Sequence, residues 1–332
     1  MDYGELRRIG FDLDGDPGPP IDPAGKRILL VYLFPALGDA VLLAPAARAL
    51  LDAGAEVDVL LRPSGARIWR HVDLPVRVLE LGDALDADYD VAVDLTRRFD
   101  ADGRPHLATA PVRLGWIGED EPNPPPGLTF GTVDHRIQAD RHWSRLQMLP
   151  LRCFGVKEPN FDVPFRIDDA ARAAADAMWT SKPRVLVVPG SREARKLWRP
   201  NAYAIAGGAL REDGASLVVV GAPAEADRIE EVADRIGAPA YTGSDLGQLL
   251  ALVQGADIVL TNDTGPLHLA YLSDVPTVAV FTQMPTVAWG PPHRTERHIV
   301  IRVDAAVEQA TDAMCGDALA NAVRALLARV ES

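Results

Sequence analysis

The feature of this sequence that most restricts its fold is an alternation of short apolar runs with helix-like segments, and this alternation occurs twice. The first series opens on the run Arg27–Leu33 and the second on the run Arg184–Pro189. A short run that is apolar throughout is typical of a strand buried on both faces of a parallel sheet. Such strands alternating with helices indicate a doubly wound α/β domain, so the repeated series predicts two of them.

The first series predicts four strands and two helices. The strands are expected at Arg27–Leu33, Glu56–Leu61, Arg77–Leu81 and Asp90–Leu95, and the helices at Asp39–Ala53 and Asp140–Phe154. Pro45 lies too deep for the first turn of its helix, so this helix should be kinked or start late. From Arg98 to Asp134 prolines interrupt the pattern, and we expect an irregular loop there.

The second series predicts four more strands and a larger set of helices. The strands are expected at Arg184–Pro189, Ser216–Gly221, Asp257–Asp263 and Thr277–Phe281, and the helices at Asp168–Trp179, Asn201–Arg211, Glu225–Ile236, Leu246–Gln254, Pro266–Leu272 and about Asp317–Val330. We therefore expect a flexible N-terminal extension over residues 1–25, one Rossmann-like domain over 26–165 and a second over 166–332. Ligands of such sheets bind at the carboxyl ends of the strands, so the loops there are candidate sites.

The loop after the first strand carries Gly38 and Asp39 and opens a helix. Gly38 permits close approach of a ligand to the backbone. Asp39 has two interpretations: a carboxylate that caps the helix by accepting backbone N–H bonds, or a general base that takes a proton from a bound hydroxyl. The spacing alone does not separate them.

A second loop, Pro189–Trp198, again joins a strand to a helix and is rich in cations. Ser191 offers a hydroxyl, and Arg192, Arg195 and Lys196 offer positive charge at the helix entrance. This combination suits a phosphate group. The alternative is an ordinary charged surface loop.

The strongest candidate is the segment Asp263-Thr264-Gly265-Pro266, with His268 two residues later. Asp263 or Thr264 can cap the following helix, and Pro266 suits its first turn. The amino end of that helix then presents N–H groups to an anion, and Thr264 and Gly265 could bind a diphosphate there. A lone histidine is more often structural, but its place beside an anion site favours a ligand role for His268.

Two groups of acids are weaker candidates. Glu225 follows another strand and could accept hydrogen bonds from ribose hydroxyls, or it could be a solvated acid favoured by the helix dipole. Asp86, Asp88 and Asp90 alternate as ligands of a hard cation do, but they precede a strand, and we interpret them as solvated loop acids. No His/Cys cluster suggests a zinc site, and no metal site is expected.

Composition and missing motifs argue against several classes of protein. Lys and Arg number 34 and Asp and Glu 47, a net charge of −13, which argues against general nucleic-acid binding. The sequence lacks the glycine-rich dinucleotide fingerprint, the P-loop and the G-x-S-x-G elbow. It shows no basic and apolar leader pattern and no apolar stretch long enough to span a bilayer. We expect a cytoplasmic protein with at most peripheral contact with the inner membrane.

At its candidate loops the sequence resembles glycosyltransferase family nine, the ADP-heptose:lipopolysaccharide heptosyltransferases. The resemblance runs from about Lys26 to the C-terminus and is carried by Leu37-Gly38-Asp39 with Pro45, by Arg113-Leu114-Gly115, by His142–Gly155, by Pro189-Gly190 with Lys196-x-Trp198-x-Pro200, and by Asn262-Asp263-Thr264-Gly265-Pro266-x-His268. It implies a GT-B fold, in which two Rossmann-like domains face a central cleft. The first domain would then bind the acceptor and the second the nucleotide-sugar donor, with no required metal.

The resemblance also implies roles for the candidate residues. Asp39 would deprotonate the acceptor hydroxyl, and Lys196 would neutralise the leaving diphosphate. The residues implied in donor binding are Gly38, Ser191, Arg192, Glu225, Asp263, Thr264, Gly265 and His268. The expected reaction moves a heptose or related sugar from an ADP-sugar, with inversion and without a cofactor, to a hydroxyl of a glycan or glycolipid such as the lipopolysaccharide inner core. A sugar-nucleotide epimerase or hydrolase of the same architecture and a non-catalytic nucleotide-sugar-binding protein are the alternatives.

Overall fold

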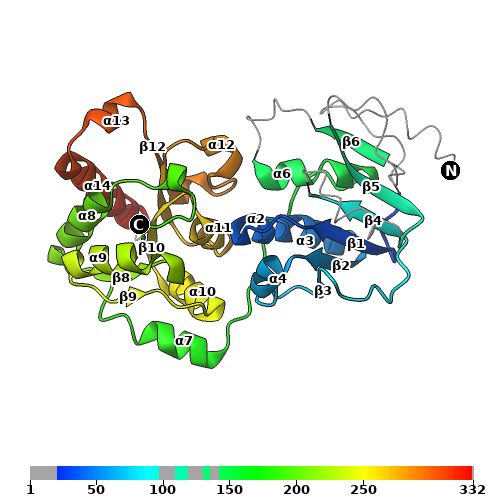
Figure 1. The fold of residues 1–332 in the computed structure, drawn as a ribbon, viewed down its shortest axis with the longest axis horizontal. Helices are drawn as coiled ribbons and strands as arrows, with labels where there is room; N and C mark the ends of the chain where they lie inside the picture. The colour runs from blue at the N-terminus through cyan, green and yellow to red at the C-terminus, as the bar shows by residue number, and fades with distance from the viewer. Residues whose placement is uncertain (1–20, 97–108, 119–129, 135–141, 331–332) are drawn as a thin grey trace. The chain divides into compact units, whose positions relative to one another are not determined.

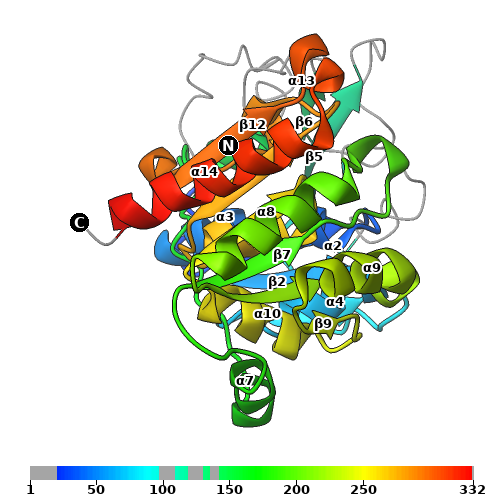
Figure 2. The same ribbon diagram turned by 90° about the vertical axis from the view of Figure 1, so that its left-hand side faces the viewer.

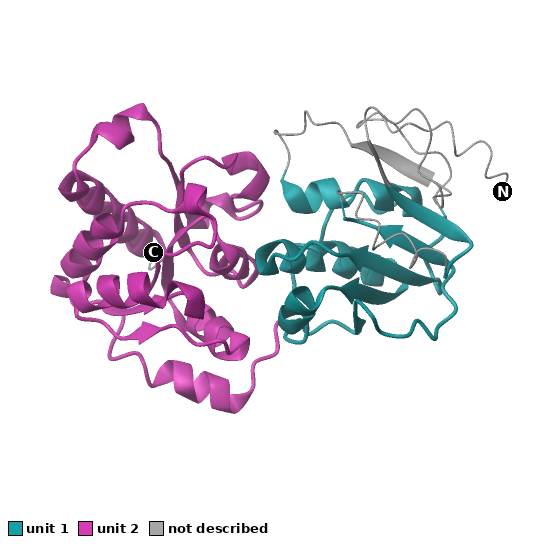
Figure 3. Cartoon of the chain, viewed as in Figure 1, with its two compact units in different colours: residues 1–164 teal, residues 165–332 magenta. Residues whose placement is uncertain are grey.

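The computed structural model describes residues 21–96, 109–118, 130–134 and 142–330. The chain forms two compact units, residues 1–164 and residues 165–332 (Figure 3). Most of the extension expected over residues 1–25 lies outside the described residues. Its described end is tied to the first unit, because the backbone N–H of Ile21 donates to the carbonyl of Cys153 at 2.6 Å.

The first unit is built around a parallel sheet with the strand order β3-β2-β1-β4-β5-β6 (Figure 1). The strands are β1 (Arg27–Tyr32), β2 (Glu56–Leu61), β3 (Arg77–Glu80), β4 (Val91–Asp94), β5 (Val112–Gly118) and β6 (Phe130–Asp134). β1 is central and buried along almost its whole length, as an apolar run covered on both faces must be. The strand order reverses between β1 and β4, and such switch points are where these sheets bind ligands.

The helix expected over Asp39–Ala53 is broken, as the position of Pro45 predicts. It forms α2 (Leu37–Val41) and α3 (Ala44–Asp52), and Pro45 lies in the first turn of α3, where the missing N–H costs nothing. The segment expected as one helix over Asp140–Phe154 is likewise two short pieces in its described part. These are α6 (Trp143–Gln147) and the 3-10 turn η1 (Pro150–Phe154).

The irregular loop expected from Arg98 to Asp134 is wrong in part, because it contains the strands β5 and β6. Both strands carry a glycine, Gly115 and Gly131, and these two residues pair with each other. Neither strand is a continuous run of branched apolar residues, so both lack the pattern by which a buried strand is recognised. The prolines expected to mark the loop, at 122 and 124–126, lie outside the described residues.

The second unit repeats the same topology with the strand order β12-β11-β10-β7-β8-β9, all parallel. Its strands are β7 (Arg184–Val188), β8 (Ser216–Val220), β9 (Ala240–Tyr241), β10 (Ile258–Asn262), β11 (Thr277–Phe281) and β12 (His298–Arg302). The switch point therefore lies between β7 and β10. The two candidate segments Pro189–Trp198 and Asp263–His268 directly follow these two strands.

Helices cover both faces of this second sheet. α8 (Pro200–Glu212), α9 (Ala226–Ile236) and α14 (Asp312–Val330) share one apolar core with its strands (Figure 2). α10 (Leu246–Gly255) and α11 (Gly265–Leu272) lie on the other face, and α7 (Asp169–Asp176) packs against α10. The pattern matches the doubly wound arrangement that the sequence predicts.

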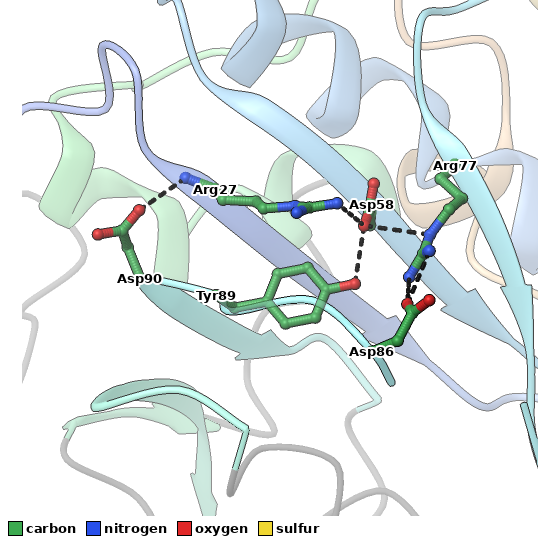
Figure 4. A network of polar contacts seen from close by, with 6 residues as sticks. All are labelled: Arg27, Asp58, Arg77, Asp86, Tyr89 and Asp90. Carbon is green, nitrogen blue, oxygen red and sulfur yellow. Dashed lines mark hydrogen bonds and ion pairs between the residues drawn. The ribbon is translucent and has the colours of Figure 1, made fainter. Parts of the chain in front are cut away.

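A polar network lies toward the amino ends of β1 to β3 (Figure 4). The carboxylate of Asp58 accepts from the Tyr89 hydroxyl at 2.7 Å and pairs with Arg27 at 3.5 Å and with Arg77 at 3.4 Å. Desolvation raises the pKa of Tyr89 to about 12, so its hydroxyl stays protonated and donates. This end of the sheet is opposite the ligand-binding end, and the network holds the strands together.

Two of the alternating acids also pair with bases at this end of the sheet. Asp86 accepts two hydrogen bonds of 2.9 Å from Arg77, which hold the pKa of the Asp86 carboxyl below its usual value. Asp90 accepts from the backbone N–H of Arg27 at 2.9 Å and pairs with Lys26 at 3.3 Å. Both side chains are also exposed, Asp86 at 70% and Asp90 at 43%, so they are solvated acids, as the sequence predicts, that in addition pair with bases.

Candidate functional site

The loops after β7 and β10 meet at the switch point of the second unit. The side-chain amide of Asn262, the last residue of β10, donates to the carbonyl of Pro189 at 2.9 Å. Asn262 is fully buried, so this bond joins the two loops below the surface. The two strongest sequence motifs, Pro189–Trp198 and Asp263–His268, are thereby brought together.

Lys196 is the cation that this junction holds. Its Nζ lies 3.1 Å from Oδ2 of Asp263 and 3.4 Å from Oε1 of Glu193. It also lies over the ring of Trp289, 5.8 Å from the centroid, and its side chain is only 13% exposed. A lysine held this way cannot be a residue of an ordinary solvated loop, and its charge is fixed in place beside α11.

Asp263 is the buried member of this pair. Its side chain is 2% exposed, and desolvation raises the pKa of its carboxyl, an effect that Lys196 opposes. Its Oδ1 has no hydrogen-bond partner among the described residues. Asp263 is not the helix cap, because that position belongs to Thr264.

The amino end of α11 adds a second source of positive potential. Thr264 takes the N-cap position without donating or accepting a capping bond, and Gly265 and Pro266 form the first turn. The first N–H groups of a helix have no partner within it and carry part of the helix dipole. The buried hydroxyl of Thr264 also has no partner in the described part of the chain. These groups suit an anion.

His268 is buried and contacts two aromatic side chains, Tyr271 and Trp289. Its Nδ1 lies 3.0 Å from the Tyr271 hydroxyl, and its ring packs against Trp289 at a centroid distance of 6.2 Å. Only 3% of its surface is exposed. The ring of Trp289 thus contacts both Lys196 and His268, two of the predicted site residues.

Glu225 lies across the loops after β7 and β8. Its Oε2 accepts from the backbone N–H of Ala222 at 2.8 Å, and its Oε1 has no partner among the described residues. A Cβ on Gly190 would lie 2.8 Å from Oε1, so the glycine is needed for this approach. The carboxylate is held with one oxygen unused, as a group that accepts from ligand hydroxyls requires.

The remaining predicted residues of this loop have lesser roles in the structure. The hydroxyl of Ser191 accepts from the backbone N–H of Glu193 at 3.2 Å, and Arg192 is exposed. Arg195 pairs with Glu193 at 2.6 Å, and its carbonyl accepts from the Thr282 hydroxyl. Lys196 is therefore the one cation of the motif that is largely buried.

Asp39 and Gly38 belong to the first unit, at the carboxyl end of β1. The N-cap of α2 is Ala36, so Asp39 lies within the first turn of the helix and is not its N-cap residue. The loop before α2 is fixed by the Arg62 guanidinium, which donates to the carbonyl of Leu33 at 2.7 Å. Asp39 is partly exposed at this ligand-binding end, and Gly38 is buried.

Sequence reasoning did not single out the residues that build the support of the site. Asn262 appears in the sequence analysis only as part of the family motif. An amide at the end of an apolar strand nevertheless indicates a buried polar group that needs hydrogen-bond partners. Tyr203 of α8, whose hydroxyl donates to Asn262 at 2.6 Å, gave no signal, because its place in the helix fits an ordinary core position. Trp289 and Glu193 are likewise recognised only from their contacts with Lys196.

The arrangement is chemically suited to a phosphorylated ligand. A buried cation, a helix amino end and acceptor oxygens without a partner among the described residues lie on neighbouring strand-end loops of one sheet. The described residues contain no group of three or more His, Cys, Asp or Glu side chains placed to hold a metal ion. Within the same described ranges, no helix combines the length and apolar character needed to cross a bilayer.

The sequence of this chain is similar to those of known glycosyltransferases. Residues 78–315 match the profile of glycosyltransferase family 9, described as heptosyltransferase. The chain is 26% identical over 131 residues to the lipopolysaccharide core heptosyltransferase OpsX of Haemophilus influenzae, and the alignment covers 37% of each protein. Because the family profile matches residues 78–315, which is most of this chain, the protein belongs to glycosyltransferase family 9.

Solved structures show the same fold. A family 9 glycosyltransferase from Veillonella parvula has a TM-score of 0.77 at 18% identity, covering 94% of this chain and 99% of that one. The E. coli ADP-heptose lipopolysaccharide heptosyltransferase II has a TM-score of 0.71 at 18% identity, covering 92% and 100%. The GT-B fold class expected from the sequence is confirmed.

Proposed function

We propose that this protein is an inverting heptosyltransferase, which moves a heptose from ADP-heptose to a hydroxyl of a glycolipid acceptor such as the lipopolysaccharide inner core. The observation that carries the proposal is the position of Lys196, 3.1 Å from Asp263 and beside the amino end of α11, in a chain of glycosyltransferase family 9. The names of OpsX and of the E. coli enzyme supply the sugar, the nucleotide and the class of acceptor.

The second unit would bind the donor. In glycosyl transfer, positive charge builds at the anomeric carbon and negative charge on the departing diphosphate. Lys196 and the first N–H groups of α11 would stabilise that negative charge, and groups fixed before the reaction do so without reorganisation cost. Ser191, Arg192, Thr264 and Gly265 would complete the contacts to the phosphates.

The donor's ribose and sugar would be held by acceptor groups. The unused oxygen of Glu225 suits the ribose hydroxyls, and it lies on the loop after β8, away from Lys196 along the strand ends. Asp263 and His268 would hold the heptose, and Asp263 would also keep Lys196 in place.

Asp39 would act as the general base on the acceptor hydroxyl. A carboxylate near the carboxyl end of β1, in the first turn of α2, is placed as a base at a ligand-binding loop should be. Attack of the deprotonated hydroxyl on the face opposite the leaving diphosphate inverts the anomeric carbon. Gly38 would allow the substrate to approach the backbone.

The proposal requires no metal ion and no cofactor, because Lys196 and α11 provide the positive charge. It places the protein in the cytoplasm, with at most peripheral contact with the inner membrane through its acceptor. Full transfer activity after treatment with a chelator is the expected result. Loss of activity that a metal ion restores would contradict the metal-free reaction.

The donor assignment is tested by a thermal-shift screen of nucleotide sugars. ADP-heptose at about 100 times its Kd should raise the free energy of unfolding by ~2.7 kcal/mol, and ADP should also stabilise the protein. A response to UDP- or GDP-sugars alone would contradict the ADP assignment. Rapid turnover of donor without acceptor would indicate an epimerase or hydrolase, and binding without turnover over a broad acceptor panel a non-catalytic binding protein.

A further inference from the structure

The loop that carries Lys196 is held from below by two buried side chains outside the predicted site. Asn262 uses its whole amide: Nδ2 donates to the carbonyl of Pro189 at 2.9 Å and lies 3.4 Å from that of Gly190, while Oδ1 accepts from the Tyr203 hydroxyl at 2.6 Å. Both side chains are fully buried. The two carbonyls and the hydroxyl leave the amide only one orientation.

Tyr203 contacts the far end of the same loop as well. Its ring packs edge-on against Trp198, with centroids 6.0 Å apart and an interplanar angle of 85°. The hydroxyl therefore holds the start of the loop through Asn262, and the ring holds its end directly. Burial raises the pKa of Tyr203 well above its ordinary value, so the hydroxyl is protonated and can donate.

These contacts lie at the switch point of the second sheet. β7 and β10 are neighbours, and the strand order reverses between them, so their loops leave the sheet in different directions. Within the described residues, Asn262 is the side chain that bonds the backbone of one loop from the other. Without it, the loop from Pro189 to Trp198 could shift relative to α11.

We propose that Tyr203 and Asn262 are positioning residues for the diphosphate site, which fix the Pro189–Trp198 loop so that Lys196 stands ready beside α11. The inference rests on the proposed function, because it assumes a diphosphate ligand. Neither residue touches the ligand in this account. Both act by removing the cost of ordering the loop when the ligand binds.

The test is the affinity of purified variants for ADP and for inorganic pyrophosphate, measured by calorimetry. Tyr203→Phe keeps the ring against Trp198 and removes only the hydroxyl, so it should weaken both ligands about five-fold, the effect of one net hydrogen bond. Asn262→Ala removes all three bonds and should weaken both ligands by more than about ten-fold. Because Tyr203 acts through Asn262, the double variant should bind no worse than Asn262→Ala.

Thr277→Val provides the matched control. It removes another buried bond of the same sheet, between Thr277 Oγ1 and His298 Nδ1 at 2.9 Å, but at the amino end of β11. It should leave the affinity for ADP unchanged. A loss of ADP affinity in this control equal to that in Tyr203→Phe would show general destabilisation and overturn the inference.

The inference and the proposed function fail in different ways. If the wild-type protein binds ADP and pyrophosphate and Tyr203→Phe binds both within about two-fold of it, the positioning role is wrong and the donor site stands. Additive losses in the double variant also overturn it. If the wild-type protein binds neither ligand, the diphosphate site itself is wrong, and the inference falls with it.

Discussion

At the residue scale, the site depends on a lysine that is held between two carboxylates in a largely buried position. Lys196 is surrounded by the carboxylates of Asp263 and Glu193 and by the ring of Trp289. Removing one partner of a buried pair leaves the other without compensation, whereas the same change in an exposed pair costs little. This contrast separates a site lysine from a surface lysine.

We expect Lys196→Ala to weaken ADP binding about 100-fold, which corresponds to ~3 kcal/mol for a lost charge-assisted contact. The matched control is Lys182→Ala, because Lys182 also pairs with an aspartate, Asp257, at 3.1 Å, but its side chain is 74% exposed. Calorimetry should show unchanged ADP affinity in the control. Equal affinities in the two variants would exclude Lys196 from the phosphate contact.

Gly190→Ala should separate the ribose contact from the phosphate contact. The new Cβ would lie 2.8 Å from Oε1 of Glu225 and displace the carboxylate. We expect ADP to bind about ten-fold more weakly, while pyrophosphate, which lacks a ribose, binds as before.

Gly208→Ala is the control for this substitution. Gly208 lies in α8 with open space around its Cβ position, so alanine there should raise the free energy of unfolding by about 0.5–1 kcal/mol and leave ADP binding unchanged. If Gly190→Ala weakened ADP and pyrophosphate equally, the assignment of Glu225 to the ribose would be wrong.

At the element scale, the central strands were predictable, whereas most of the edge strands were not; the edge strand β3 is the exception. β2 and β11 begin and end where the sequence predicts, because each is a short run rich in branched apolar residues. β5, β6 and β12 lie at or near sheet edges, and β12 is buried at only one of its five positions, so the apolar signal is weak there.

The loop residues of the candidate site were predictable from the sequence, whereas the side chains that support them were not. Asp263 and Thr264 directly follow β10, and Lys196 lies in the loop after β7. Their meeting could be inferred because the carboxyl ends of parallel strands lie at one edge of the sheet. The contacts of Tyr203 and Trp289 could not, because they depend on how α8 and a short late helix, α12 (Thr286–Trp289), pack against the loops. Packing of this kind has no local sequence signature.

The edge strand β12 supplies a prediction on pH. Burial, followed by the neighbouring charges of His293 and Arg297, lowers the pKa of His298 to about 4, although Asp274 acts in the opposite direction. An unfolded histidine titrates near 6.5, so below that pH the unfolded state takes up a proton that the folded state does not. His298 therefore contributes stability above pH 6.5 that is lost as the pH falls toward 4.

The loss should reach about 3 kcal/mol for a shift of this size. Denaturant unfolding of the wild type and of His298→Gln, measured between pH 7.5 and 4.5, should show the wild-type advantage shrinking as the pH falls. An advantage that is constant over this range would contradict the low pKa of His298.

At the scale of the whole molecule, the protein combines an overall acidic composition with a small positive site. The net charge is −13, yet the ends of β7 and β10 gather a buried lysine and a helix amino end. The acidic excess disfavours long polyanions, whereas fixed local charges favour one diphosphate. In the proposed reaction both units have a role: the second binds the donor, and the first supplies the general base.

Asp39→Ala should separate donor binding from sugar transfer. Because Asp39 lies in the first unit, ADP should bind the variant as tightly as the wild type, while sugar transfer should fall about 10²–10⁴-fold, the usual contribution of a general base. Asp52→Ala is the control, since Asp52 lies on the next helix, α3, and pairs with Arg48 at 2.8 Å in an exposed position. Unchanged transfer in Asp39→Ala would remove Asp39 as the base.

The most direct test of the account is the release of ADP from ADP-heptose, followed with and without a heptose-deficient lipopolysaccharide acceptor. We predict ADP release only when the acceptor is present, in equal amount to the heptose transferred, and its loss in both Lys196→Ala and Asp39→Ala. ADP release at the same rate without acceptor, or no release with acceptor present, would contradict the assignment as a heptosyltransferase.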